Sequence, residues 1–164
     1  IYGISDFGLS RDLGITRQEA KNYIELYFSR YPKVKEYMDN MVKEAHETGK
    51  VRTMFGRMRE LPDINSRNFN RRSFAERTAM NTPIQGTAAD IIKLAMNKVE
   101  SILEEETFKS RLLLQVHDEL VLEVVNEELD AIQTLLKETM ESIVELHVPL
   151  IVDVHNAENW ALVK

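Results

Sequence analysis

The segment Arg111-Leu-Leu-Leu-Gln-Val-His-Asp-Glu-Leu-Val-Leu-Glu-Val-Val125 decides the fold class of this chain. Its aliphatic and β-branched residues form two short runs, which predict strands over residues 111–117 and 120–125 that meet near Asp118-Glu119. Apolar residues at helical spacing occupy most of the remaining sequence. We therefore predict an α+β fold in which several helices pack on a small antiparallel sheet.

Two adjacent carboxylates, Asp118 and Glu119, stand where the predicted strands meet. A tight hairpin prefers Asn-Gly or Asp-Gly, and neighbouring carboxylates repel each other beside apolar residues. Local preferences that are broken in an otherwise consistent sequence tend to mark function. A divalent cation would relieve the repulsion, and Mg²⁺ suits because it takes one or two protein carboxylates together with substrate phosphates. The spacing fits an exposed acidic turn without a role equally well.

Helices account for most of the other elements that the sequence predicts. They are a short helix from Ser5 or Asp6 to Leu13, a helix opened by the capping box Thr16-Arg17-Gln18-Glu19, a helix from Pro32 to Gly49, a hairpin or loop over residues 50–64, a helix from Arg67 to Asn81, a longer helix ending near Glu104-Glu105-Glu106, a helix over residues 127–146 and a last strand from Leu150 to Val154. An interior proline removes a backbone donor, so Thr82-Pro83 predicts a break or kink.

Charge is distributed unevenly along the chain. The net charge is −6, but residues 50–77 hold eight Lys or Arg and three Asp or Glu, a net charge of +5 that leaves −11 for the remainder. Seven of the eight cations are Arg, whose planar guanidinium suits phosphate. This concentration favours a polyanionic partner such as nucleic acid, whereas the alternative interpretation is a solvated polar face.

Composition excludes several classes of protein. The chain has no cysteine, which rules out disulfides and thiolate zinc sites and fits a reducing compartment. No apolar run approaches the roughly 20 residues that a membrane span needs, so we expect no membrane partner.

Several stretches, taken together, resemble the signature motifs of the bacterial family A DNA polymerases. The matching stretches are Gln115-Val116-His117-Asp118-Glu119, Arg71-Arg72 with Ala75-Glu76-Arg77, Asn81, Pro83, Gln85-Gly86-Thr87-Ala88-Ala89-Asp90, Tyr2-Gly3, Leu61-Pro62-Asp63-Ile64 and Glu158-Asn159-Trp160. Any one of these motifs would be weak evidence, but they are collinear and cover essentially the whole chain.

The resemblance implies roles for particular residues. Asp118 would be the second of two metal-bridging aspartates, with Glu119 an auxiliary carboxylate and His117 near the primer 3′ terminus. Tyr2 would stack near the nascent base pair, and Arg77, Asn81 and Gln85 would face the duplex. The basic character of residues 50–77 separately predicts that Arg71 and Arg72 contact phosphates. Two alternatives stay open: Asn81 and Gln85 as caps at a helix break, and Arg71 and Arg72 paired with Glu76 and other acids inside the fold.

The implied activity is template-directed addition of deoxynucleotides to a primer 3′-hydroxyl by two-metal chemistry with Mg²⁺. Residues 1–64 would belong to the fingers and residues 65–164 to the C-terminal part of the palm. The expected partners are primer–template DNA and deoxynucleoside triphosphates, in a monomeric protein of the bacterial cytoplasm and nucleoid. The first motif aspartate would lie upstream of Ile1, so the isolated chain is expected to be inactive. The rival readings are a non-catalytic nucleic-acid-binding fragment and a helical interaction module.

Overall fold

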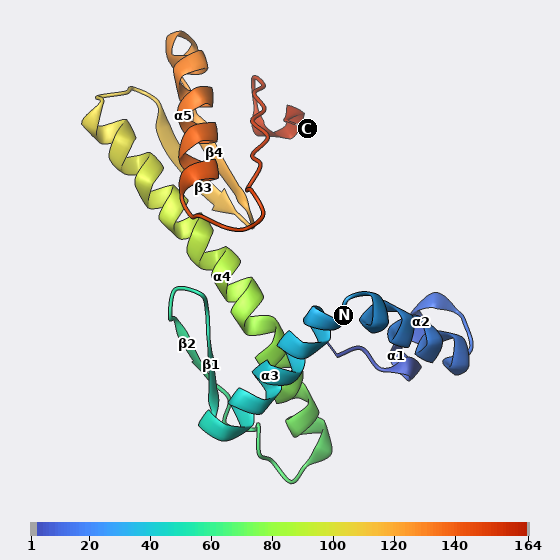
Figure 1. The fold of residues 1–164 in the computed structure, drawn as a ribbon. Helices are drawn as coiled ribbons and strands as arrows, with labels where there is room; N and C mark the ends of the chain where they lie inside the picture. Colours follow the sequence, from blue (N-terminus) through green and yellow to red (C-terminus); the bar gives the residue numbers. More distant parts are fainter. Residues whose placement is uncertain (1–2, 164) are drawn as a thin grey trace. The chain divides into compact units, whose positions relative to one another are not determined.

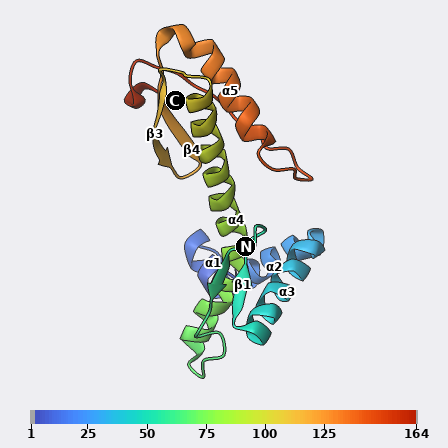
Figure 2. The ribbon, with the colours of Figure 1, turned by 90° about the vertical axis from the view of Figure 1, so that its left-hand side faces the viewer.

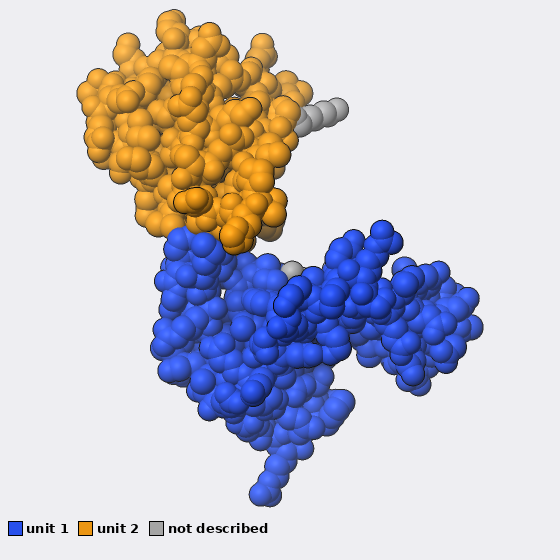
Figure 3. Space-filling view, viewed as in Figure 1, with its two compact units in different colours: residues 1–87 blue, residues 88–164 orange. Residues whose placement is uncertain are grey.

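A computed structural model of the chain describes residues 3–163 and divides into two compact units. The first unit comprises residues 1–87 and the second unit residues 88–164 (Figure 3). The predicted α+β class is confirmed, because helices predominate and the strands form small antiparallel sheets. We describe each unit by itself.

The first unit consists of helices and one short hairpin (Figure 1). In chain order its elements are α1 (Asp6–Leu13), α2 (Arg17–Arg30), α3 (Pro32–Thr48), β1 (Lys50–Arg52), β2 (Met58–Glu60) and the N-terminal part of α4 (Phe69–Glu105). The predicted capping box opens α2, with Thr16 and Glu19 each bonding the backbone of the other. Gly14 and Gly49, both left-handed, follow the ends of α1 and α3 as predicted.

The β1–β2 hairpin is anchored on α4 through its connecting loop. The backbone N–H of Met54 donates to Oγ1 of Thr87 at 2.9 Å, and the Arg59 guanidinium donates to the Thr82 hydroxyl at 3.3 Å. A Cβ atom at Gly86 would lie 2.6 Å from Cγ2 of Thr53, so this close approach requires glycine. A small core joins the hairpin to α3 and α4, and its buried members are Ala45, Val51, Leu61, Ile64, Ala75 and Ala79.

Helix α4 runs without interruption through Pro83, so the predicted break at Thr82-Pro83 is wrong. The helix begins at Phe69, two residues later than predicted, after the Asn68 side chain has accepted the N–H groups of Asn70 and Arg71. Buried alanines precede the proline, and buried Ala95, Val99 and Leu103 follow it. Packing on both sides of Pro83 therefore offsets the loss of one backbone hydrogen bond, which is the reason for the continuous helix.

The second unit packs one helix and one hairpin against the C-terminal part of α4 (Figure 2). Its elements after α4 are β3 (Arg111–Val116), β4 (Glu119–Glu123), the 3₁₀ turn η1 (Asn126–Glu128), α5 (Leu129–Ser142) and the 3₁₀ turn η2 (Trp160–Leu162). The core centres on Val99, Leu103, Ile132 and Leu136. Leu112, Leu120 and Leu122 pack against it, so one face of the hairpin is covered.

Two predictions for the end of the chain are wrong. Residues 150–154 form no strand within the described part of the chain, and the N–H of Val152 donates to the Glu141 carboxylate instead of to a neighbouring strand. The helix predicted over residues 127–146 is shorter, because it starts as η1 and its regular part spans Leu129–Ser142. The Glu128 carboxylate accepts the backbone N–H groups of Lys109 and Ser110, which ties this start to the segment before β3.

Candidate functional site

The β3–β4 hairpin closes with a two-residue loop. Val116 pairs with Glu119, which leaves His117 and Asp118 as the connection. The φ angle of His117 is 53°, in the left-handed region that short hairpin loops require and that histidine enters more readily than most residues. The two carboxylates are adjacent as predicted, but Asp118 lies in the loop and Glu119 is the first residue of β4.

Both carboxylates at this loop are exposed and unpaired. Across residues 3–163, the carboxylate of neither Asp118 nor Glu119 takes part in a hydrogen bond or ion pair. The loop itself is braced, because Nε2 of Gln115 donates to the His117 carbonyl at 2.6 Å. A braced loop that carries two exposed carboxylates is suited to bind a cation.

The donor set at the loop is only part of a metal site. Among the described residues, no group of three or more His, Cys, Asp or Glu side chains is placed to hold a metal ion. Asp118 and Glu119 nevertheless fit Mg²⁺, which takes one or two protein carboxylates and completes its octahedron with water and phosphate oxygens.

A second set of predicted residues lies on α4 in the first unit. Arg77, Asn81 and Gln85 recur every four residues on a continuous helix, so they share one face. Arg77 and Gln85 are exposed, whereas Asn81 is half-buried and its Oδ1 atom has no partner among the described residues. The alternative role of Asn81 and Gln85 as helix caps is excluded, because α4 has no end near them.

The N-terminal segment passes close to this face of α4. Gly3 has a φ of 81°, and a Cβ atom there would lie 2.7 Å from Cε of Met80 and 3.0 Å from Cγ of Arg77. Only glycine fits both this backbone angle and this approach. Tyr2, the predicted nucleotide-stacking residue, lies outside the described residues, so its role stays a prediction.

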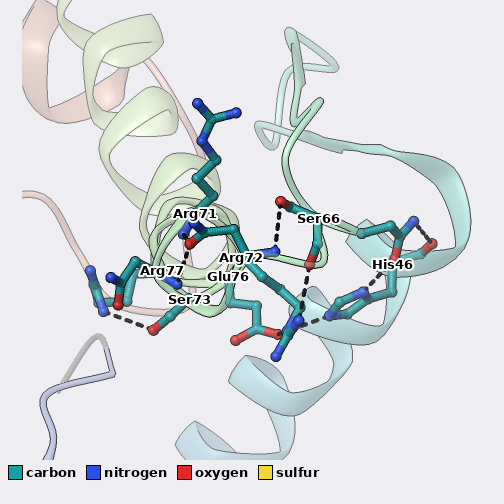
Figure 4. Close-up of polar contacts among 10 residues, drawn as sticks. His46, Ser66, Arg71, Arg72, Ser73, Glu76 and Arg77 are labelled. Atoms are coloured by element: carbon teal, nitrogen blue, oxygen red, sulfur yellow. Dashed lines mark hydrogen bonds and ion pairs between the residues drawn. The ribbon is translucent and has the colours of Figure 1, made fainter.

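Arg71 and Arg72 are adjacent in sequence but point to different surroundings (Figure 4). Nη1 of Arg72 donates to the Ser66 carbonyl at 2.9 Å, and its Nε lies 4.0 Å from Oε1 of Glu76. The Arg71 side chain is 69% exposed, and its ion pair with Asp63 is long, at 3.9 Å. Arg71 is therefore available to a phosphate, while Arg72 connects parts of the fold.

Sequence reasoning missed a cluster around His46. Its ring nitrogens contact Asn65 and Glu76, which lie 19 and 30 residues further along the chain. Neither spacing carries a periodic signal, so no pattern within the sequence indicates these contacts.

Comparisons with known proteins place the chain in a family. The model of the family "DNA polymerase family A" matches residues 1–162. DNA polymerase I of Lactococcus lactis subsp. lactis is 61% identical over 160 residues, and that of Geobacillus stearothermophilus is 59% identical over 160 residues. In both cases the match covers 98% of this chain and 18% of the relative. The chain thus spans less than a fifth of the length of these relatives.

One solved structure with a similar fold contains nucleic acid. It is the polymerase domain of Pol1 from M. smegmatis in complex with a DNA primer–template and dNTP. It matches with a TM-score of 0.95 and 42% sequence identity, covering 99% of this chain and 29% of that chain.

Proposed function

This chain belongs to DNA polymerase family A, and from that premise we propose that it supplies part of the nucleotide-adding centre of a template-directed DNA polymerase. The reaction is attack of a primer 3′-hydroxyl on the α-phosphate of a deoxynucleoside triphosphate, with pyrophosphate leaving. The observation that carries the proposal is the pair of exposed, unpaired carboxylates at the braced β3–β4 loop.

Asp118 and Glu119 have different tasks in this proposal. Asp118, in the loop, would hold Mg²⁺. When bound, the metal would favour the 3′-alkoxide and stabilise the negative charge that develops on the α-phosphate. Glu119, on the strand, would be an auxiliary carboxylate beside the metal held by Asp118. His117 donates a hydrogen bond to a phosphate or sugar oxygen near the primer terminus. Since this chain provides one carboxylate pair and no third acidic ligand among its described residues, we expect no incorporation by the isolated chain.

The exposed face of α4 binds the duplex. Arg77 and Gln85 donate to minor-groove acceptors, which are almost the same in all base pairs and so accept any correct pair. Asn81 lies between them on the same face, and its Oδ1 atom is buried without a partner among the described residues. Arg71 contacts a backbone phosphate, with Arg72 beside it, and Tyr2 stacks near the nascent pair.

The remaining assignments follow the same proposal. Residues 1–64 belong to the fingers and residues 65–164 to the C-terminal part of the palm. The partners are primer–template DNA and deoxynucleoside triphosphates, and the intact protein is a monomer that acts in replication and repair on DNA in the bacterial cytoplasm. No helix within residues 3–163 is long and apolar enough to cross a membrane.

The test is Asp118→Ala in the intact polymerase, with Glu123→Ala at the far end of the same hairpin as control. We expect Asp118→Ala to slow single-turnover incorporation at least about a thousandfold, because metal ions contribute several kcal/mol and about 1.4 kcal/mol is tenfold in rate. Glu123→Ala should keep the parental rate. Incorporation near the parental rate by Asp118→Ala would leave the chain a non-catalytic DNA-binding part.

A further inference from the structure

His46, near the end of α3, has an acceptor oxygen opposite each of its ring nitrogens (Figure 4). Nδ1 lies 2.8 Å from Oδ1 of Asn65, and Nε2 lies 3.1 Å from Oε1 of Glu76. The orientation of the Asn65 amide is fixed by a separate contact, because its Nδ2 donates to the backbone carbonyl of His46 at 3.1 Å. The amide oxygen, and not the nitrogen, therefore faces the ring.

Only a doubly protonated imidazole satisfies both contacts. The neutral ring has one N–H and one lone pair, so one of its nitrogens would meet an acceptor oxygen without a proton between them. The hydrogen bond with Asn65 raises the pKa of His46, Glu76 adds to this effect, and desolvation and Arg72 oppose it. The charged groups that face the ring are Glu76 and Arg72 of α4, while the loop over residues 61–68 contributes the uncharged Asn65.

The contacts of Glu76 extend beyond His46. Its Oε1 atom also lies 4.0 Å from Nε of Arg72, and Nη1 of Arg72 donates to the Ser66 carbonyl. The contacts of His46, Glu76 and Arg72 therefore connect three segments: the end of α3, the loop over residues 61–68 and the first turns of α4. Arg71, which is exposed, directly precedes Arg72 on the same turn of α4.

We propose that the His46 imidazolium is a positioning residue that holds the first turns of α4 for DNA and makes DNA affinity depend on pH. Loss of the ring proton sets a lone pair against Glu76 or Asn65, which loosens α3 and the loop over residues 61–68 from α4. That loop carries Asp63 and Ser66, the partners of Arg71 and Arg72, so both arginines lose support. Because the folded pKa is raised, this support is complete below the ordinary histidine pKa and is lost as the pH rises through the folded value. The link to DNA rests on the proposed function, whereas the contact itself does not.

The experiment measures the Kd of the intact polymerase for primer–template from pH 5.5 to 8.5 at fixed salt. The variants are His46→Lys, which keeps a cation at every pH, His46→Gln, which is never charged, and His147→Gln, an exposed histidine in the second unit, as matched control. The parent should lose affinity by roughly two- to fivefold as the pH rises, the range of a partly exposed ion pair. His46→Lys should show little of this change, His46→Gln should be weak throughout, and His147→Gln should follow the parent.

A melting curve for each variant at each pH separates the possible failures. The Tm of the parent should fall relative to that of His46→Lys as the pH rises, because the contacts of the His46 imidazolium with Asn65 and Glu76 are lost. Equal Kd and Tm profiles for the parent and both His46 variants would overturn the proposal. A His46→Gln defect that His46→Lys does not rescue would also overturn it, because charge would not be the cause. If the intact protein neither binds nor extends a primer, the proposed function fails, and the predicted effect of His46 on DNA affinity fails with it. The Tm profile still tests whether the His46 imidazolium stabilises the fold.

Discussion

The two units carry net charges of opposite sign. Residues 1–87 contain 15 Lys or Arg and 11 Asp or Glu, a net charge of +4, whereas residues 88–164 contain 6 and 16, a net charge of −10. DNA phosphates are attracted by the first unit and repelled by the second. DNA can approach the carboxylates of the second unit only when bound cations lie between these carboxylates and the phosphates. Under the proposed function, this difference corresponds to a division of work, with duplex binding in the first unit and metal-assisted chemistry in the second.

Within each unit, charged side chains differ in their surroundings. In the second unit Glu123 pairs with Arg111 at 2.7 Å, and Glu128 and Glu141 accept backbone N–H groups, whereas the Asp118 and Glu119 carboxylates have no such partner within the described part of the chain. In the first unit Arg72 is tied to the fold while the neighbouring Arg71 is exposed. Arg72, Glu123, Glu128 and Glu141 therefore contribute to holding the fold, whereas Arg71, Asp118 and Glu119 are accessible to a ligand.

The first prediction concerns the two carboxylates of the second unit. Glu119→Ala in the intact polymerase should slow incorporation by roughly 10- to 100-fold, the usual cost of losing a group that orients a metal site. This is less than the loss expected for Asp118→Ala, because Glu119 is not the bridging ligand. Single-turnover rates of both variants check the order. A larger defect in Glu119→Ala would show that the two roles are reversed.

The second prediction tests the face of α4 in the first unit. Arg77→Ala should weaken extension of a matched primer more than Gln85→Ala, because a hydrogen bond from a charged donor is worth about 1.5–3 kcal/mol and a neutral one about 0.5–1.5 kcal/mol. Both variants should also become more sensitive to mismatches near the primer end. Lys93→Ala, exposed on the same helix but in the second unit, is the control and should extend normally. If both variants keep the parental matched-to-mismatched ratio, the minor-groove role is refuted.

The third prediction separates Arg71 from Arg72. Arg71→Ala should flatten the log–log dependence of DNA affinity on salt by about 0.9, the contribution of one phosphate contact. Arg72→Ala should lower the Tm, because it breaks the bond to the Ser66 carbonyl and the pair with Glu76. Salt titrations beside melting curves give both readouts. Equal slopes for Arg71→Ala and the parent would assign Arg71 to the scaffold as well.

The fourth prediction concerns the dependence of stability on pH, which differs between the two units and is expected to be the smallest of these effects. The backbone N–H of Lys109, followed by the Ser110 hydroxyl, lowers the pKa of Glu128 below its ordinary value of 4.5. The stabilisation by Glu128 is therefore complete above the ordinary carboxylate pKa, and it is lost as the pH falls through the lowered pKa of the folded protein. Glu128→Gln should reduce the Tm at pH 7, and the difference from the parent should shrink in acid. A constant difference across pH would contradict the assignment. His46, whose pKa is raised, gives the first unit the opposite dependence.

Local patterns predicted most of the fold. The capping box Thr16–Glu19, the left-handed Gly49 and the paired runs around residues 111–123 depend on neighbouring residues, so the sequence contains their cause. The predictions that failed depend on distant residues. Pro83 stays inside a helix because cores on both sides hold it, and residues 150–154 form no strand where no neighbouring strand pairs with them.

In the candidate site, too, features that depend on neighbouring residues were predictable, and features that depend on distant residues were not. Asp118 and Glu119 adjoin in sequence, so their proximity was predictable, although the turn position of His117 depends on the register of the strands. The different surroundings of Arg71 and Arg72 were not predictable, since the partners Ser66 and Glu76 come together only when the loop folds on α4. The His46 contacts were missed for the same reason.

One titration tests the division of work most directly. Single-turnover incorporation is measured against DNA concentration for Asp118→Ala and Arg71→Ala in the intact polymerase, which gives a maximal rate and a Kd for each variant. We predict that Asp118→Ala loses its maximal rate and keeps its Kd, because its contribution belongs to the transition state. Arg71→Ala should raise the Kd and keep the maximal rate. The account is contradicted if Asp118→Ala loses DNA affinity as strongly as rate, or if Arg71→Ala is slow at saturating DNA.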